Sequence, residues 1–421
     1  MSLHAVDLSA VRAPSPAPTR VRVLDDVSEL IQAARLFRTA MVGLPNFGPI
    51  DAGFVADIYE PGRTLGAFLS GTLVGTVNSY ASTLTVPGGG RLAHAAVTHV
   101  GVLPTHTRRG IGTALLERQL AEARSRGDAV ATLRASDARI YAHFGYGIAS
   151  SQVSFDLAAE GARLRPDVPR GGPVRFVDPD EAWSLLPVIH AQVGTAQAGA
   201  IARWRGWWHF QRLRQDLSKA PAYVVVAGEE GRECGYVRYH PIGLDEWFAG
   251  SDRTLVVDDL VAADNAAYGA LVAHLLNVDL VHRILFPGRP LDDALPWLFE
   301  NHRQARVTGQ RDETWLRLLD VRQALETRRY GGEGEVVLAV SDPLFAENNG
   351  RFRLSARGAV PTDAPAQAEL DIGALATTYL GGTRWWQLAR AGRVKAESEA
   401  VLSTLDTLFA TSAQPHAGTV F

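Results

Sequence analysis

The chain has 421 residues, of which 46% are hydrophobic and 21% are charged, a composition typical of a folded protein with two or three domains. Its formal net charge of −3 gives no basic surface, so we expect no nucleic-acid partner. No apolar stretch is long enough to span a membrane, and the single cysteine, Cys234, excludes an internal disulfide. These features predict a cytoplasmic protein.

The first segment extends over 21–157, behind a proline-containing stretch at 1–20 that we expect to be flexible. Hydrophobic spacing and turn residues predict a helix, a hairpin, a strand, a glycine-containing loop, an amphipathic helix and a further strand, in that order. The expected helix is Val27–Val42, and the expected strands are Leu65–Phe68, Leu73–Ser79, Ala95–Val102 and Ala129–Leu133. The alternation of helices and strands predicts a mixed α/β domain.

The loop after the strand Ala95–Val102 has the chemistry of an anion site. Pro104 ends the strand because it cannot donate to a sheet, and free N–H groups at the start of the next helix favour a pyrophosphate. Glycines permit close approach and arginines add charge. The candidate cofactor-binding residues are Val100, Gly101, Val102, Arg108, Arg109, Gly110, Ile111, Gly112 and Thr113. An ordinary strand–helix turn with solvated arginines remains the alternative at this point.

A second segment at 174–325, after a Pro/Gly-rich linker at 158–173, repeats the element order of the first. We expect a hairpin whose two strands are Tyr223–Ala227 and Cys234–Tyr239, followed by a strand at Thr254–Leu260 and a helix at Ala266–Leu276. Its loop at 263–268 carries Asp264 and lacks the paired arginines and glycines. We therefore expect a diverged internal duplication whose second copy is catalytically silent.

The last segment, 326–421, predicts a smaller α+β unit with no metal-ligand cluster. Strands are expected at Glu335–Val340 and Arg351–Ser355, and helices, after Gln367–Ile372, at Ala374–Leu380 and Glu397–Phe409. Beyond them, Ser412–Val420 contains Pro415 and Gly418 and predicts an extended tail. Nine extended residues span at most about 30 Å, so the tail is long enough to carry Phe421 back to the first segment.

Two motifs carry a resemblance to a known family. Val100-x-Val102-x-Pro104 followed by Arg108-Arg109-Gly110-Ile111-Gly112 resembles the acetyl-CoA signature of the GNAT acetyltransferase superfamily. Arg134–Asp137 and Ile140–Gly147 are similar to the Eis (enhanced intracellular survival) family of multi-acetylating aminoglycoside N-acetyltransferases, and the similarity extends to Phe421. Thr107 departs from the pattern, because the superfamily usually has Arg or Gln there, and this predicts weaker cofactor affinity.

The resemblance implies an α/β fold with mixed sheets. It places a catalytic GNAT domain at 21–157, a degenerate GNAT domain at 174–325 and a sterol-carrier-like domain at 326–421 that supplies the terminal carboxylate. It also implies acetyl-CoA as co-substrate, no metal, a small-molecule amine as acceptor and a homo-oligomer, expected to be a hexamer.

Residue roles follow from the same resemblance. Tyr141 is expected to be the general acid that protonates the CoA thiolate, and the α-carboxylate of Phe421 the base that accepts the amine proton. The backbones of Val100 and Val102 are expected to pair with pantetheine like an added strand, and Ser136 and Asp137 join the cofactor contacts. His143 is expected to be structural.

The acceptor side is less well defined by the sequence. Family members bind polycationic amines in an acidic, aromatic-lined cleft, and Asn46 stands where their pattern has an acid, which weakens the case for aminoglycosides. Trp204, Trp207 and Trp208 are candidates to line the cleft, with core packing or a subunit contact as the alternatives. The competing functions are an apolar-ligand-binding protein and a CoA-binding scaffold without turnover.

Overall fold

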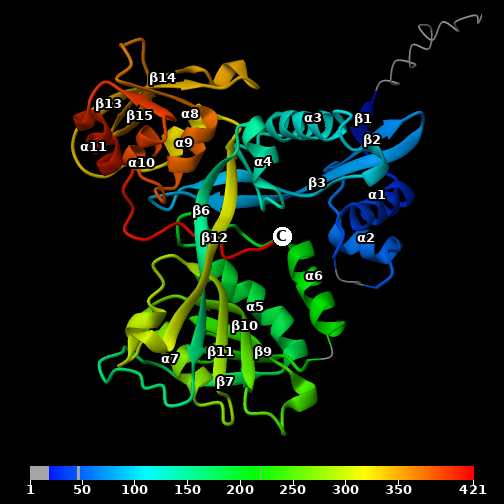
Figure 1. Cartoon of the computed structure of the whole chain (residues 1–421), viewed down its shortest axis with the longest axis vertical. Coiled ribbons are helices and arrows are strands. Elements are labelled where there is room, and N and C mark those ends of the chain that lie inside the picture. Colours follow the sequence, from blue (N-terminus) through cyan, green and yellow to red (C-terminus); the bar gives the residue numbers. More distant parts are fainter. Residues whose placement is uncertain (1–18, 45–47, 219) are drawn as a thin grey trace, which may run out of the picture.

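The computed structural model describes residues 19–44, 48–218 and 220–421. Most of the stretch expected to be flexible and the candidate substrate residue Asn46 lie outside them, and Arg20 already begins the first strand. Among the described residues, twelve strands form one mixed sheet and five form a second sheet. Figure 1 shows the first part of the chain at the upper right, the second below it and the C-terminal part at the upper left. No described helix combines the length and the apolarity that crossing a membrane requires.

The helices and strands expected from the sequence occur in the expected order in all three parts, among further elements that were not expected. The first part contains β1 (Arg20–Val23), α1 (Val27–Ala40), α2 (Ala52–Ile58), β2 (Thr64–Leu69), β3 (Thr72–Thr85), β4 (Arg91–Val102), α3 (Ile111–Ser125), β5 (Val130–Leu133), α4 (Ala138–Tyr141) and β6 (Gly147–Ala158). The second contains β7 (Val174–Val177), α5 (Pro179–Val193), α6 (Arg205–Asp216), β8 (Tyr223–Ala227), β9 (Gly235–Ile242), β10 (Thr254–Ala262), α7 (Asn265–Leu276), β11 (Arg283–Pro290) and β12 (Ala305–Leu318). The third contains α8 (Val321–Thr327), β13 (Glu335–Ser341), β14 (Gly350–Ser355), β15 (Gly358–Pro361), β16 (Ala368–Asp371), α9 (Ile372–Tyr379), α10 (Trp385–Arg390), β17 (Val394–Ala396) and α11 (Glu399–Leu408).

The first two parts share one sheet because two long strands belong to both. The strand order is β1-β2-β3-β4-β5-β12-β6-β11-β10-β9-β8-β7. One end of β12 (Trp315–Leu318) pairs with β5, and β12 pairs with β6 along nearly its whole length, from Ala305 to Leu316. The far end of β6 pairs in turn with β11. Figure 1 shows β6 and β12 side by side as the connection between the upper and lower parts. Each half of the sheet is therefore completed by a strand from the other half of the chain.

Helices cover both faces of the first half of the sheet. On one face, α3 buries Ile111, Leu115 and Leu120 against β2, β3 and β4. On the other face, α1 and α2 bury Leu30, Val55 and their neighbours. The candidate site lies between these layers, at the ends of β4 and β5.

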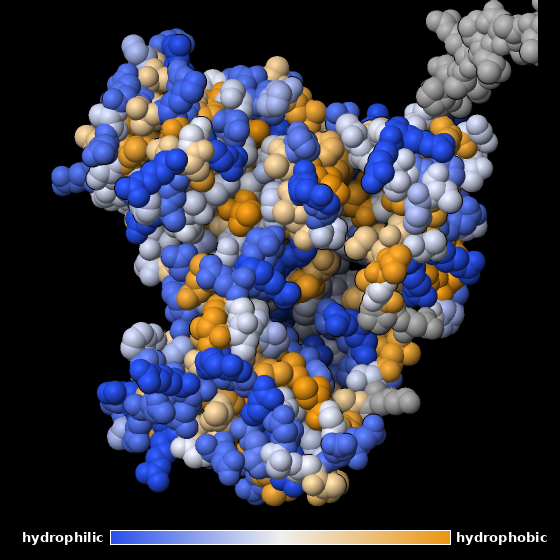
Figure 2. Space-filling view, in the orientation of Figure 1, coloured by the Kyte–Doolittle hydropathy of each residue, from blue (hydrophilic) through white to orange (hydrophobic). Residues whose placement is uncertain are grey.

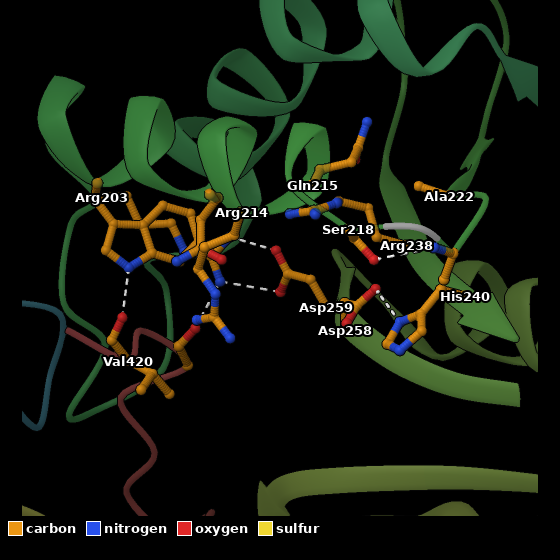
Figure 3. Close-up of a pocket in the computed structure, with 14 residues that line it drawn as sticks. Arg203, Arg214, Gln215, Ser218, Ala222, Arg238, His240, Asp258, Asp259 and Val420 are labelled. Carbon is orange, nitrogen blue, oxygen red and sulfur yellow. Dashed lines mark hydrogen bonds and ion pairs between the residues drawn. The ribbon is translucent and has the colours of Figure 1, made fainter. Parts of the chain in front are cut away.

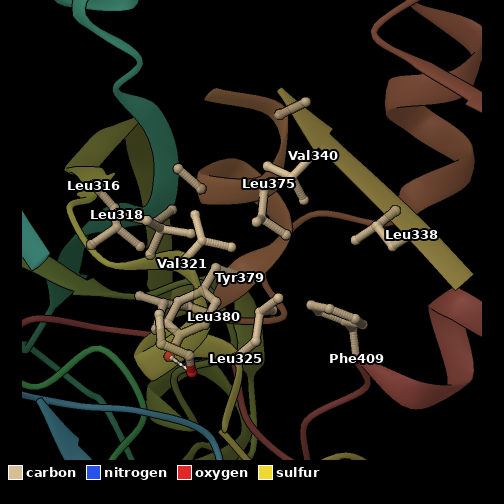
Figure 4. Close-up of a cluster of buried hydrophobic side chains, with 14 of the residues drawn as sticks. Leu316, Leu318, Val321, Leu325, Leu338, Val340, Leu375, Tyr379, Leu380 and Phe409 are labelled. Atoms are coloured by element: carbon tan, nitrogen blue, oxygen red, sulfur yellow. Dashed lines mark hydrogen bonds between the residues drawn. The ribbon is translucent and has the colours of Figure 1, made fainter. Parts of the chain in front are cut away.

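The C-terminal part is joined to the first part by a continuous hydrophobic core. Figure 4 shows Leu316 and Leu318 of β12 among side chains of the third part, including Leu375, Tyr379 and Phe409. Arg317 and Asp342 add a fully buried ion pair, with Nη2 2.7 Å from Oδ2. Burying this apolar surface, at about 25 cal/mol per Å², fixes the C-terminal part and so fixes where the tail begins.

Candidate functional site

A β-bulge near the end of β4 opens the sheet. β4 pairs in parallel with β5 only at His94, Ala95 and Ala96. Its pairing with β3 then shifts by one residue, so that Asn78 lies opposite Thr98 and Thr76 opposite Gly101. His99 within the bulge has φ 51°, a left-handed conformation that non-glycine residues seldom adopt. Bulges bend a strand and increase its twist, so β4 and β5 diverge and the backbone of Val100–Val102 is left without β5 as a partner.

The start of α3 provides the second half of an anion site. Gly110 is the N-cap with φ 76°, and no side chain caps the helix among the described residues. The first backbone bond of the helix goes from the Ala114 N–H to the Gly110 carbonyl, so the preceding amides remain available. Arg108 and Arg109 are exposed beside them. The loop therefore presents N–H groups, a positive helix dipole and two cations at one point, next to the open edge of β4.

In the second copy, a side chain caps the start of the corresponding helix. Asp264 caps α7, and its carboxylate accepts a 2.8 Å hydrogen bond from the Ala267 N–H. A fixed negative charge at a helix start repels an anionic ligand and satisfies an amide that would bind it. The contrast between Gly110 and Asp264 is the clearest physical difference between the two copies.

Tyr141 lies across the opening from β4. It ends α4, which follows the carboxyl end of β5, and its ring packs edge-on against Tyr146 with centroids 6.0 Å apart. The same hydrophobic cluster includes Val100 and Val102 at its margin. Burial raises the pKa of Tyr141, against a hydrogen bond with Ser136 that lowers it. The phenol therefore keeps its proton at neutral pH and is available as an acid.

Asp137, expected among the cofactor contacts, has local partners in the structure. Its carboxylate caps α4 by accepting from the Arg139 N–H at 3.0 Å, and it also pairs with the Arg139 side chain. These contacts lower the pKa of Asp137 to about 2, so it is ionised at neutral pH. Ser136 is exposed at the same turn. The two residues thus lie beside Tyr141, on the β5 side of the opening.

The C-terminal tail runs between the first and second parts of the chain, and side chains from both hold it. The Arg134 guanidinium donates to the Thr419 carbonyl at 2.7 Å, and that of Arg203 to the Gly418 carbonyl at 2.6 Å. The Trp207 indole N–H donates to the Val420 carbonyl at 2.7 Å. Figure 1 shows the terminus between these two parts, near the start of α6. Three consecutive carbonyls of the tail are therefore fixed by donors far away in the sequence.

Glu313 of β12 anchors the tail at Ala417, one residue before these three carbonyls. Its carboxylate is almost fully buried, accepts from the Ala417 N–H at 3.0 Å and lies 3.0 Å from His416 Nδ1 and 3.3 Å from Arg134. Burial acts to raise the pKa of Glu313, but the charges of His416 and Arg134 outweigh it and lower the pKa to about 2. Glu313 therefore stays ionised and holds the tail at neutral pH.

Phe421 completes a cluster of aromatic rings beside the bulge. The Tyr80 ring stacks on that of Trp204 at 4.6 Å, and the Trp204 ring meets the edge of Phe421 at 5.6 Å. The full cluster consists of Phe37, Tyr59, Tyr80, His99, Trp204 and Phe421. Figure 2 shows that the molecular face is hollowed between the two parts of the chain, where Figure 1 places the terminus. The cluster, the bulge and the chain end therefore meet in one place.

His99 is neutral in this setting. The Tyr59 hydroxyl and His99 Nδ1 lie 3.2 Å apart, and burial lowers the pKa of His99 to about 4. Its ring packs against Phe37 with centroids 4.6 Å apart. His99 thus presents an uncharged imidazole to the aromatic cluster at neutral pH.

Of the three tryptophans expected near the site, the structure separates one from the others. Trp204 belongs to the aromatic cluster, whereas Trp207 and Trp208 are buried and pack edge-on against each other at 4.8 Å. Sequence reasoning missed Phe37, Tyr59 and Tyr80, together with the anchors Arg134 (known only as part of a motif), Arg203 and Glu313. The anchors come from elements far apart in the chain, and no local pattern distinguishes them from other buried polar residues.

Comparisons with known proteins agree with this geometry. Residues 21–149 and 199–322 each match an acetyltransferase (GNAT) domain family, and residues 321–418 match a sterol carrier protein domain. An uncharacterized N-acetyltransferase of Streptomyces avermitilis is 35% identical, covering 90% of this chain and 94% of its own. N-acetyltransferase Eis of Mycobacterium tuberculosis is 34% identical, covering 78% of this chain and 80% of its own. This chain is an N-acetyltransferase of the Eis family, within the GNAT superfamily.

Solved structures support the same assignment. Eis1 from Mycobacterium abscessus is 44% identical and superposes with a TM-score of 0.89, covering 96% of this chain and all of its own. A GCN5-related N-acetyltransferase from Anabaena variabilis shares the fold with a TM-score of 0.82 at 22% identity. The α/β fold with mixed sheets, two GNAT domains and a sterol-carrier-like domain is thereby confirmed. GNAT acetyltransferases, the superfamily to which this chain belongs, use acetyl-CoA.

The expected domain limits stay predictions, although the structure shows how the parts connect. The boundary expected between residues 325 and 326 falls inside α8. The strand β6, assigned to the first domain, also pairs with β11 of the second. The linker 158–173 is packed in part, since Leu164 forms a bridge to Phe299.

Proposed function

We propose that this chain transfers the acetyl group of acetyl-CoA to a primary amine of a small molecule. The observation that carries the proposal is the uncapped start of α3 beside the edge of Val100–Val102 that β5 does not pair. The helix amides suit a pyrophosphate and the strand edge suits the amide groups of pantetheine. The second copy keeps the helix but places Asp264 at its start, so we assign CoA binding to the first copy alone.

Tyr141 and Phe421 are the proposed catalytic residues. The amine nitrogen attacks the thioester carbonyl carbon, the carbon–sulfur bond breaks, and the departing thiolate takes a proton from the Tyr141 hydroxyl. The ammonium proton passes to the α-carboxylate of Phe421, directly or through water. Supporting this division of roles, burial keeps Tyr141 protonated, and the tail is anchored at the Val420 carbonyl while the Phe421 ring packs against Trp204 of the aromatic cluster.

The aromatic cluster supports an amine as the acceptor. Faces of Tyr, Trp and Phe rings attract ammonium groups by about 0.5–2 kcal/mol each, and the neutral His99 adds no positive charge to repel them. A carboxylate at Phe421 would attract the same group. A cationic small molecule, with aminoglycosides as the polycationic example, is therefore the proposed substrate class.

The oligomer implied by the resemblance is part of the proposal. Several large side chains of the second part are exposed, including Phe176, Phe248 and Trp297, the last two at 87% and 74%. Contiguous exposed apolar patches mark subunit contacts, and these side chains are available to contribute to one. We propose a homo-oligomer, with a hexamer as the specific expectation.

A thiol-release assay tests the function. Acetyl-CoA is offered with aminoglycosides, polyamines, lysine-containing peptides and arylalkylamines, and mass spectrometry identifies a product heavier by one acetyl group. CoA binding by calorimetry without turnover on any amine would favour the scaffold alternative. Tyr379, Trp385 and Phe409 of the C-terminal part are at most 2% exposed and belong to its hydrophobic core, which supports a role in placing the tail.

A further inference from the structure

The second GNAT copy retains a pocket at the position where the first copy has its aromatic cluster. β10 carries a one-residue bulge between Val257 and Asp259, as β4 does around His99. A cavity of about 440 Å³ lies beside this bulge, enclosed by α6, β9, β10 and the C-terminal tail. Cavities of this size are typical of small-molecule sites. The acceptor side of the second copy has therefore kept its shape, although Asp264 closes its cofactor side.

Charged groups replace the aromatic rings in this pocket. The cluster that lines it comprises Arg203, Arg214, Arg238, His240, Asp258 and Asp259. Figure 3 shows these side chains gathered between α6 and the strands, with Val420 of the tail on one side. Three guanidinium groups thus face two carboxylates.

Both carboxylates already have partners. Asp259 accepts from the Arg203 Nη2 at 3.0 Å and from the Tyr236 hydroxyl at 2.8 Å. Asp258 lies 2.9 Å from His240 Nδ1. Neither carboxylate forms an ion pair with Arg214 or Arg238 among the described residues. The remaining charge of the pocket is therefore positive.

Arg238 is the decisive group. Its side chain is buried, with only 6% of the residue exposed, and its Nε has no hydrogen-bond partner within the described parts of the chain. Its guanidinium packs 4.5 Å from the Trp183 ring, which fixes its plane but accepts no hydrogen bond from its edge. A buried guanidinium with an N–H group that lacks a partner is costly, and a bound oxyanion would provide acceptors for this group.

We propose that this pocket binds a small organic anion through a carboxylate or phosphate group held by Arg238 and Arg214. Two guanidinium groups suit the paired oxygens of either anion, and the cavity has room for further polar atoms. The occupant also meets the tail, because Gly418 and Val420 line the same pocket. Binding therefore fastens the segment that ends at the Phe421 carboxylate.

Calorimetry with inorganic phosphate and with succinate tests the site on the full chain. We expect a Kd of about 1 mM or below for at least one probe and a loss of at least roughly tenfold in Arg238→Met. Arg238→Lys should recover part of the affinity, because it keeps the charge. Arg212→Met is the control for a lost arginine outside the pocket, since Arg212 lies on α6 with Arg214, does not line the pocket and pairs with Asp180. Arg214→Met, at an exposed position, gives the same information if Arg238→Met does not fold.

A second control separates this pocket from the loop at α3, which is also suited to phosphate. Binding that persists in Gly110→Asp and is lost in Arg238→Met supports the proposal. Binding lost in Gly110→Asp and kept in Arg238→Met overturns it, as does the absence of binding of both probes to the wild-type chain. These measurements use no acetyl transfer, so their outcome is independent of the proposed function.

Hydrogen exchange tests the link to the tail. We expect the bound probe to slow exchange at residues 416–421 in the wild-type chain and to have no such effect in Arg238→Met. Unchanged exchange at these residues with the site saturated would refute the link.

Discussion

Moving the terminal carboxylate is the strongest test of the proposed chemistry. Appending Gly-Ser after Phe421 turns its carboxylate into a neutral amide carbonyl and carries the charge two residues further. The tail itself should stay in place, because Arg134, Arg203 and Trp207 hold its carbonyls at 2.6–2.7 Å. The Thr419 hydroxyl adds a bond of 2.9 Å to the Ile201 carbonyl.

The anchoring energy decides what the extension disturbs. Four hydrogen bonds at about 0.5–1.5 kcal/mol each contribute roughly 2–6 kcal/mol, enough to keep residues 417–420 seated while the added residues extend beyond them. Loss of the base should then lower kcat by roughly 10²–10⁴, equivalent to about 3–5 kcal/mol of the barrier. Deleting Phe421 should have a similar effect, since a shift of one residue moves the carboxylate by about 3.5 Å, beyond hydrogen-bond reach.

Steady-state kinetics by thiol release, with calorimetry for CoA and thermal unfolding as a check on folding, measures the result. Phe421→Leu is the matched control, because it keeps the carboxylate and loses only the ring contact with Trp204 at 5.6 Å. An aromatic pair contributes about 0.5–1.5 kcal/mol, so we expect a change of roughly tenfold at most. Wild-type kcat in the extended chain would refute the terminal carboxylate as the base.

Four further predictions follow from the same geometry. Gly110→Asp should weaken CoA binding by more than roughly tenfold, whereas Gly127→Asp, at a similar φ beyond the end of α3, should leave it unchanged; equal affinities in calorimetry would contradict the loop assignment. Tyr141→Phe should lower kcat by roughly 10²–10⁴ with CoA affinity retained, and Tyr146→Phe, the control, should change kcat little. Full turnover in Tyr141→Phe would exclude Tyr141 as the general acid. Glu313→Gln should destabilise the fold by about 1–3 kcal/mol at neutral pH. The pKa of Glu313 in the folded chain is about 2, below the ordinary value near 4.3, so its contribution to stability is present above pH 4 and is lost as the pH falls towards 2. The free energies of unfolding of the wild type and Glu313→Gln should therefore converge near pH 2. A constant difference between them from about pH 4 to pH 2 would contradict the assigned role of Glu313. Sedimentation should give a hexamer, and a monomer at all concentrations would contradict the proposed oligomer.

The sequence by itself determined the elements whose signals are local. Most of the expected helices and strands of the three parts match the structure to within a few residues, and the helix expected to end at Val42 ends at Ala40, where Met41 leaves the helical conformation. The loop from Val100 to Thr113 was predictable because its glycines, its arginines and the start of α3 are contiguous, and backbone amides at a helix start need no distant partner. Asp264 at the matching position predicted the difference between the copies for the same reason.

Only the tertiary structure decided which strands and side chains come together. β12 lies between β5 and β6, although more than 140 residues separate it from either strand in the chain. The spacing of hydrophobic residues within a strand does not show which distant strand it pairs with. The same holds for the aromatic cluster, which joins Tyr80 of β3 to Trp204 and the chain end. The sequence could predict that the tail reaches back, from its length. Its path was decided by Arg134, Arg203, Trp207 and Glu313, because a buried polar group binds whichever donor or acceptor the fold places within about 3 Å.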